Sequence, residues 1–139
     1  MHRFAYALLF LCSALPSGAC GNDAPTPTSP TPAPRPPLTE TFAGELNRNS
    51  AATHTFVAQA SGAVTATLDT LAPEDTAAIG LSLGTWNGSA CQIVIANDNA
   101  AQGAVVIGAA SSAGNLCVRV YDVGKVATLA SYQLTVVHP

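Results

Sequence analysis

The sequence predicts an all-β protein, an antiparallel β-sandwich that is jelly-roll-like and has about eight strands. Two observations lead to this fold class. Over residues 38–139, apolar residues alternate with polar or small ones, which is the period of a strand and not of a helix. Turn-forming residues recur at roughly 8–12-residue intervals, the spacing of short strands joined by tight connections. Periodicity does not determine the order of the strands in the sheets.

The alternation is clearest in four segments. In one of them Val64, Ala66 and Leu68 alternate with Thr65 and Thr67. Gly, Asn, Asp or Ser residues separate the segments, at 47–50, 61–62, 87–88, 97–99 and 111–115. In chain order, the expected strands lie at 41–46, 53–58, 64–69, 79–84, 91–96, 104–107, 116–121 and 131–136.

The turn between the fourth and fifth expected strands needs more than two residues. A two-residue turn at 87–88 would place a polar residue opposite Leu83, whereas one extra loop residue pairs Leu83 with Ile93. The same register pairs Leu81 with Ile95 and gives one consistent apolar face. We therefore predict a three-residue or bulged turn.

The four cysteines predict one disulfide. Cys12 lies in the N-terminal apolar segment and Cys20 at its end, which leaves Cys91 and Cys117 as a pair in an oxidising compartment. The bridge would close a loop of 26 residues and stabilise the fold by about 3.5 kcal/mol. The register above puts the two cysteines on opposite faces, so either one strand bulges or Cys91 lies beyond the regular pairing.

Residues 1–19 are predicted to be a signal peptide. Arg3 supplies an early positive charge, and the uncharged run over 4–15 is shorter than the ~20 residues of a membrane-spanning helix. Ser17-Gly18-Ala19 stands directly before Cys20, an arrangement that resembles the bacterial lipobox. Acylation of Cys20 would hold the protein on a membrane, because two or more chains anchor stably. Ordinary cleavage after Ala19 with secretion is the alternative.

Residues 20–37 are expected to form a disordered linker between that anchor and the domain at 38–139. Seven of the ten prolines fall within it. Proline fixes φ and lacks an N–H, so the segment favours extended polyproline II. Fully stretched, this stalk would reach roughly 50 Å.

Composition excludes one class of partner. Charged residues make up 9% of the chain, and five Lys and Arg against eight Asp and Glu give a net charge of −3. Five basic side chains are too few to neutralise the row of phosphates in a nucleic-acid backbone. We therefore expect no nucleic acid as a partner.

Several segments of the domain resemble the bacterial pre-peptidase C-terminal domain, above all 42–46, 113–122 and 132–136. This family consists of small β-sandwiches appended to exported proteins. The resemblance implies a β-sandwich fold and a non-enzymatic accessory role. Some members bind calcium or polymers such as collagen or polysaccharide. These 139 residues include no peptidase and no acidic cluster that matches a calcium site, so no ligand is carried over.

One motif suggests hydrolase chemistry. Residues 80–84 match G-x-S-x-G, and Asp98, Asp122 and His138 follow in hydrolase order. The motif requires a strained strand-to-helix turn beside an oxyanion hole. Ser82 is instead expected in mid-strand between leucines with no helix after it, so the sequence favours a small outward residue over a nucleophile.

Other polar and aromatic residues carry weaker signals. The oxygen-bearing residues at 97–99 and 74–75 match no EF-hand loop, and His54 and His138 lack partners at ligand spacing, so no metal or cofactor is expected. Trp86, the only tryptophan, lies near a hairpin tip. We expect it to pack under its own loop; the alternative, stacking on a sugar ring, makes it the candidate ligand contact.

Together these features predict a non-enzymatic, lipid-anchored bacterial protein that displays a recognition domain outside the cytoplasm. Its partners would be the membrane, through Cys20, and an envelope protein or extracellular polymer. A module that binds polysaccharide or a collagen-like polymer is the alternative, and a hydrolase that uses Ser82 is the second alternative.

Overall fold

The computed structural model describes residues 33, 35–73 and 78–139. This part of the chain contains strands and no helix, and the strands are antiparallel in two four-stranded sheets, which confirms the predicted fold class. In chain order they are β1 (Leu38–Asn47), β2 (Ala51–Ala58), β3 (Gly62–Ala72), β4 (Ile79–Trp86), β5 (Cys91–Ala100), β6 (Val105–Ala110), β7 (Gly114–Tyr121) and β8 (Leu129–His138).

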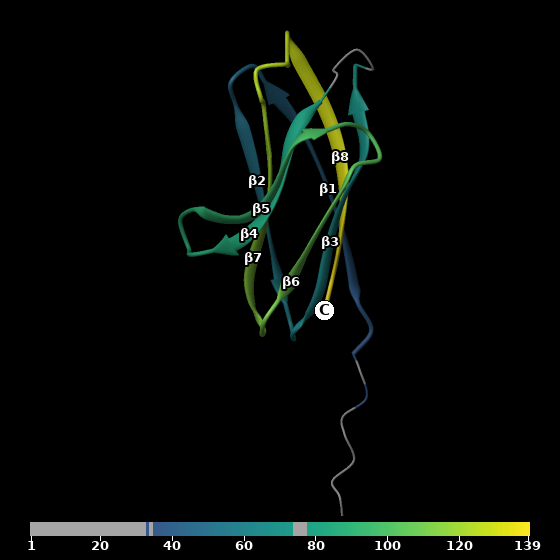
Figure 1. The fold of residues 1–139 in the computed structure, drawn as a ribbon, viewed down its shortest axis with the longest axis vertical. Helices are drawn as coiled ribbons and strands as arrows, with labels where there is room; N and C mark the ends of the chain where they lie inside the picture. Colours follow the sequence, from purple (N-terminus) through teal and green to yellow (C-terminus); the bar gives the residue numbers. More distant parts are fainter. Residues whose placement is uncertain (1–32, 34, 74–77) are drawn as a thin grey trace, which may run out of the picture. The chain divides into compact units, whose positions relative to one another are not determined.

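The strand order is that of a jelly roll. Sheet A has the order β1-β8-β3-β6 and sheet B the order β2-β7-β4-β5. The strands pair from the first and last toward the middle of the order, β1 with β8, β2 with β7, β3 with β6 and β4 with β5. A long ribbon of paired strands folded over into two sheets gives this topology. Figure 1 shows the two layers, with the C-terminus at the same end as the start of β1.

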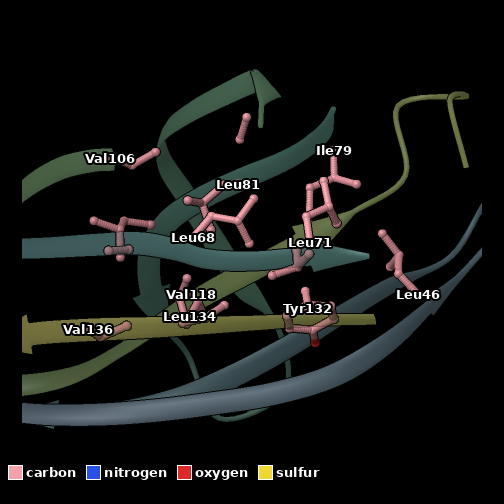
Figure 2. Packing of buried hydrophobic residues seen from close by; sticks show 14 of the residues in the cluster. Leu46, Leu68, Leu71, Ile79, Leu81, Val106, Val118, Tyr132, Leu134 and Val136 are labelled. Carbon is pink, nitrogen blue, oxygen red and sulfur yellow. The ribbon is translucent and has the colours of Figure 1, made fainter. Parts of the chain in front are cut away.

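The core lies between the two sheets and is formed by one side of each strand. In β3 Val64, Ala66 and Leu68 are buried, whereas the threonines between them are only partly covered. Leu134 and Val136 of β8 complete the layer from sheet A. Figure 2 shows these side chains facing those of sheet B, among them Ile79, Leu81 and Val118.

A bulge in β3 changes the alternation near its end. The register with β8 shifts between Leu68 and Thr70, so Asp69 has no direct partner in the ladder. Leu71 is buried in consequence, although strict alternation from Leu68 would have directed Thr70 inward. Asp69 accepts a hydrogen bond from the Thr135 hydroxyl at 2.7 Å.

The strand predictions are confirmed in number and place, with one wrong turn. Residues 97–99 were expected in a turn but belong to β5, and the connection follows at 101–104. There Gly103 has a φ of 84°, and the Ala104 N–H donates to the Ala101 carbonyl at 2.9 Å. Asn and Asp are tolerated at the end of β5 because it is an edge strand whose polar side chains bind neighbouring loops and strands.

The predicted register of β4 and β5 is wrong by two residues. Leu83 lies opposite Ile95 instead of Ile93, and Leu81 lies opposite Asn97. Residues 87–90 connect the strands, and the ladder shifts between Leu83 and Gly84 because β5 carries an extra residue there. A bulge was expected at the turn, but it lies inside the strand.

Candidate functional site

The outward side of β4 is a row of small residues. Ile79, Leu81 and Leu83 face the core, so Gly80, Ser82 and Gly84 face outward, yet these three are also buried. Neighbouring strands therefore cover the outer face of sheet B at β4. The β7 residues opposite the row are Tyr121 at Gly80, Arg119 at Ser82 and Cys117 at Gly84.

The Tyr121 side chain crosses β4 at Gly80. A β-carbon at Gly80 would lie 2.2 Å from the Tyr121 ring, so only glycine leaves room for it. The phenol then donates a hydrogen bond to the Asp98 carboxylate on β5. Burial together with this hydrogen bond raises the pKa of Tyr121 to about 12. A side chain of β7 is thus connected to β5 across the strand that separates them.

The Cys91–Cys117 disulfide crosses β4 at Gly84 in the same way and confirms the predicted pairing. The two Cα atoms are 5.8 Å apart, whereas strands two positions apart in a flat sheet are separated by about 9.5 Å. The start of β5 must therefore curl over β4. A β-carbon at Gly84 would lie 2.1 Å from the Gln92 carbonyl oxygen. The predicted register put the two cysteines on opposite faces of the sheet. The bulge in β5 removes this conflict, because it turns Cys91 to the outer face that Cys117 occupies.

The curled β4–β5 hairpin forms one wall of a groove on the outer face of sheet B. In Figure 1 the hairpin leaves the body of the sandwich on the left. The groove has a volume of about 440 Å³, with β2 and β7 as its floor. The lining residues are Ala51, Thr53, Trp86, Ser89, Ala90, Cys91 and Arg119.

Hydrogen bonds hold the tip of the hairpin in one conformation. The Asn87 side-chain oxygen accepts from the backbone N–H groups of Ser89 and Ala90, at 3.0 and 2.8 Å. It also accepts from the Ser89 hydroxyl at 3.1 Å, and Gly88 takes a φ of 97°. Trp86, on the groove side, is therefore presented by a fixed wall and not by a loose loop.

Among the described residues that line the groove, Arg119 is the only charged one. It lies opposite Thr53 in the ladder between β2 and β7, and its guanidinium carbon is 5.6 Å from the centroid of the Tyr121 ring. Within 33, 35–73 and 78–139 the one ion pair joins His138 to Glu40, so no carboxylate of these residues neutralises Arg119. The sequence analysis did not single out Arg119. The only indication in the sequence is that Arg119 is a single basic residue within an alternating strand.

Ser82 lies under this surface and not in the groove. Its side chain is fully buried and donates one hydrogen bond, to the Arg119 carbonyl at 3.4 Å. The two histidines of the sandwich bind elsewhere. His54 pairs with the Tyr132 hydroxyl at 2.8 Å, and His138 pairs with Glu40 at 2.9 Å. The structure thus places neither imidazole on Ser82.

The polar residues at 97–99 bind protein groups. Asp98 holds Tyr121, the Asn97 side-chain oxygen accepts from the Asn99 N–H at 3.0 Å, and Asn99 accepts from Lys125 at 2.9 Å. No cluster of three or more His, Cys, Asp or Glu side chains that could hold a metal ion occurs in the described ranges. Residues 74–75, the predicted signal peptide, Cys20 and nearly all of the predicted linker lie outside the described residues.

A second cavity lies at the edge where β5 and β6 meet. It has a volume of about 50 Å³, and its lining is apolar apart from Thr85. Leu83, Val94 and Ile95 form part of that lining. The cavity is too small for a sugar ring and offers no charged group, so the groove at Trp86 and Arg119 is the stronger candidate site.

No family model matches the chain, and no curated protein matches it either. Within the described residues, no helix has both the length and the hydropathy to span a membrane.

Proposed function

We propose that the protein is a non-enzymatic bacterial lipoprotein whose β-sandwich recognises an extracellular polysaccharide. In this proposal the acylated Cys20 anchors the chain and the proline-rich residues 22–37 act as a stalk. The stalk displays the sandwich outside the cytoplasm. The resemblance to the pre-peptidase C-terminal domain is consistent with such an accessory module and stays a prediction.

One observation carries the recognition role, the presence of Trp86 in the wall of an open groove. An indole face packs against the C–H face of a sugar ring, while hydroxyl groups beside it bind the sugar hydroxyls. Thr53 and Ser89 supply such hydroxyls. The hydrogen bonds of Asn87 hold this wall in place, so little conformational entropy is lost when a ligand binds.

The contacts of Ser82 support a non-enzymatic role. A serine nucleophile needs an adjacent base and access for a substrate, whereas Ser82 is buried beside a backbone carbonyl. We expect Ser82→Ala to leave any esterase or peptidase turnover of the purified protein unchanged. A turnover that disappears with Ser82→Ala would contradict this part of the proposal.

Polysaccharide binding is tested with Trp86→Ala on an array of neutral and acidic polysaccharides. We expect about a fivefold loss of affinity, because an aromatic contact contributes roughly 1 kcal/mol. Trp86→Tyr should retain part of the affinity. Ile107→Ala, at an exposed residue of β6 outside the groove, is the matched control and should bind normally. Equal binding by Trp86→Ala and the wild type would exclude the groove.

The anchor is tested by metabolic labelling of the full chain with palmitate in a bacterial host. Label should enter the wild type and be absent from Cys20→Ser. Label that persists in Cys20→Ser would show that the lipid is attached elsewhere, and a wild type without label would exclude a lipoprotein.

A further inference from the structure

Resting on this proposed function, we infer that the polysaccharide bound in the groove carries carboxylate groups, and that Arg119 selects for them. The inference starts from the position of Arg119. Its side chain comes from β7, in the middle of the sheet, and lines the floor of the groove opposite the wall that holds Trp86. A ligand stacked on the indole therefore lies within the same groove as the guanidinium.

The guanidinium has hydrogen-bonding capacity to spare. Arginine has five N–H donors in a planar fork that matches a carboxylate. Among the described residues, the contact that the structure gives this guanidinium is a cation–π contact with the Tyr121 ring. The Asp98 carboxylate accepts from the Tyr121 phenol, and within the described residues no ion pair joins it to Arg119. Arg119 is thus oriented by Tyr121 and left able to bind an anion.

The charge of the site differs from that of the chain. The chain has a net charge of −3, so a general attraction for polyanions is not expected. Among the described residues, Arg119 is the one charged side chain that lines the groove. Selection for an anionic ligand must therefore come from this residue.

The combination of groups favours a uronic acid. Such a sugar has an apolar ring face for Trp86 and hydroxyls for Thr53 and Ser89. Its carboxylate would form two parallel hydrogen bonds with Arg119. A neutral sugar would leave the arginine hydrated and without a partner, so it would bind more weakly in the same place.

Titration calorimetry of the purified protein tests the inference with matched ligands. Polygalacturonate, alginate and hyaluronate are each compared with their methyl esters, which keep the sugar backbone and remove the charge. We expect at least one acid form to bind tenfold or more tightly than its ester, because charge-assisted hydrogen bonds are strong. Higher salt should reduce this difference.

Variants identify the residue responsible. Arg119→Gln should abolish the preference for the acid form, and Arg119→Lys should retain part of it. Arg35→Gln is the matched control, because it removes the same charge from an exposed arginine that binds Gln59 beyond the far end of β2. It should leave the preference intact. An unchanged midpoint of urea unfolding shows that the variants remain folded.

The outcomes separate this inference from the proposed function. Acid and ester forms that bind equally, with Trp86→Ala abolishing both, would overturn the role of Arg119 and leave polysaccharide recognition standing. An equal loss of preference in Arg119→Gln and Arg35→Gln, or Arg119-dependent binding of sulfated polymers alone, would also overturn the inference. Failure of every charged and neutral polysaccharide to bind would overturn both proposals.

Discussion

Two glycines allow β4 to be crossed by its neighbours. Gly80 and Gly84 alternate with core leucines and face outward, where a larger residue would be ordinary in an antiparallel sheet. The Tyr121 ring occupies the space at Gly80, and the Gln92 carbonyl occupies the space at Gly84. The G-x-S-x-G pattern therefore serves close packing in this fold.

Gly84→Ala should destabilise the protein by about 1–3 kcal/mol, the usual cost of overpacking. The new methyl group would meet the backbone of β5, which cannot rotate away as a side chain can. Urea unfolding of the oxidised protein measures the change. Gly114→Ala is the control, since nothing lies within 4 Å of the added methyl group. Equal midpoints for the two variants would show that β5 does not press on Gly84.

Tyr121 should remain protonated until the pH approaches 12, because burial and Asp98 raise its pKa. An unfolded tyrosine ionises near pH 10. The unfolded state then holds fewer protons between about pH 10 and 12, so folding stability should fall as the pH rises through this window. Ultraviolet titration of the phenolate should show a lower pKa in Asp98→Asn. Asp69→Asn, in sheet A, should leave the curve unchanged, and identical curves for all three proteins would contradict the Tyr121–Asp98 contact.

Among the strands, β1 and β8 of sheet A meet β2 of sheet B at a polar seam. The His54 ring of β2 stacks on Phe42 of β1 at 4.9 Å between centroids, and its Nε2 lies 2.8 Å from the Tyr132 hydroxyl of β8. Gly44 makes room for this hydroxyl, since a β-carbon there would lie 2.6 Å from it. The His54 imidazole of sheet B thus contacts both of these strands of sheet A.

Acid should weaken this seam. Burial lowers the pKa of His54 below its ordinary value of 6.5, so the unfolded state takes up a proton at a higher pH than the folded state. The stability contributed by neutral His54 is therefore present above about pH 6.5 and is lost progressively below it. The free energy of unfolding, measured with urea from pH 7.5 to about 5, should fall more steeply for the wild type than for His54→Gln. Parallel curves would contradict the prediction.

At the scale of the whole molecule, the first and last strands lie side by side in sheet A. β8 lies between β1 and β3, and it pairs with β1 along its full length from Leu129 to His138. Its inward residues Tyr132, Leu134 and Val136 belong to the core. The sheet is therefore complete only when the last strand is in place.

Deletion of residues 129–139 should unfold the protein, because it removes four core side chains, those of Ala130, Tyr132, Leu134 and Val136, and leaves β1 without a partner strand. Far-ultraviolet circular dichroism would show the loss of sheet. A chain that begins at Pro37 is the control, because residues 33, 35 and 36 lie outside the strands and are exposed. A C-terminal deletion that still unfolds cooperatively would show that β8 is dispensable.

The sequence by itself determined the class of fold and the positions of the strands, because the alternation of apolar residues records which side chains meet the core. Val64 to Leu68 and Leu116 to Val120 show this directly. The cysteine pair could also be predicted, since only two cysteines remain outside the N-terminal segment. These inferences depend only on the local periodicity of apolar residues and on the number of cysteines.

Tertiary structure alone decided the register of β5 and the existence of the groove. The extra residue in β5 does not change the pattern of apolar residues along the strand. The sequence therefore could not indicate the bulge, and the predicted pairing of Leu83 with Ile93 was wrong. Trp86 was singled out as an isolated aromatic, but Arg119 and Thr53 join it only because β7 and β2 pass beside the curled hairpin. A binding surface assembled from three distant segments depends on strand order, which periodicity does not contain.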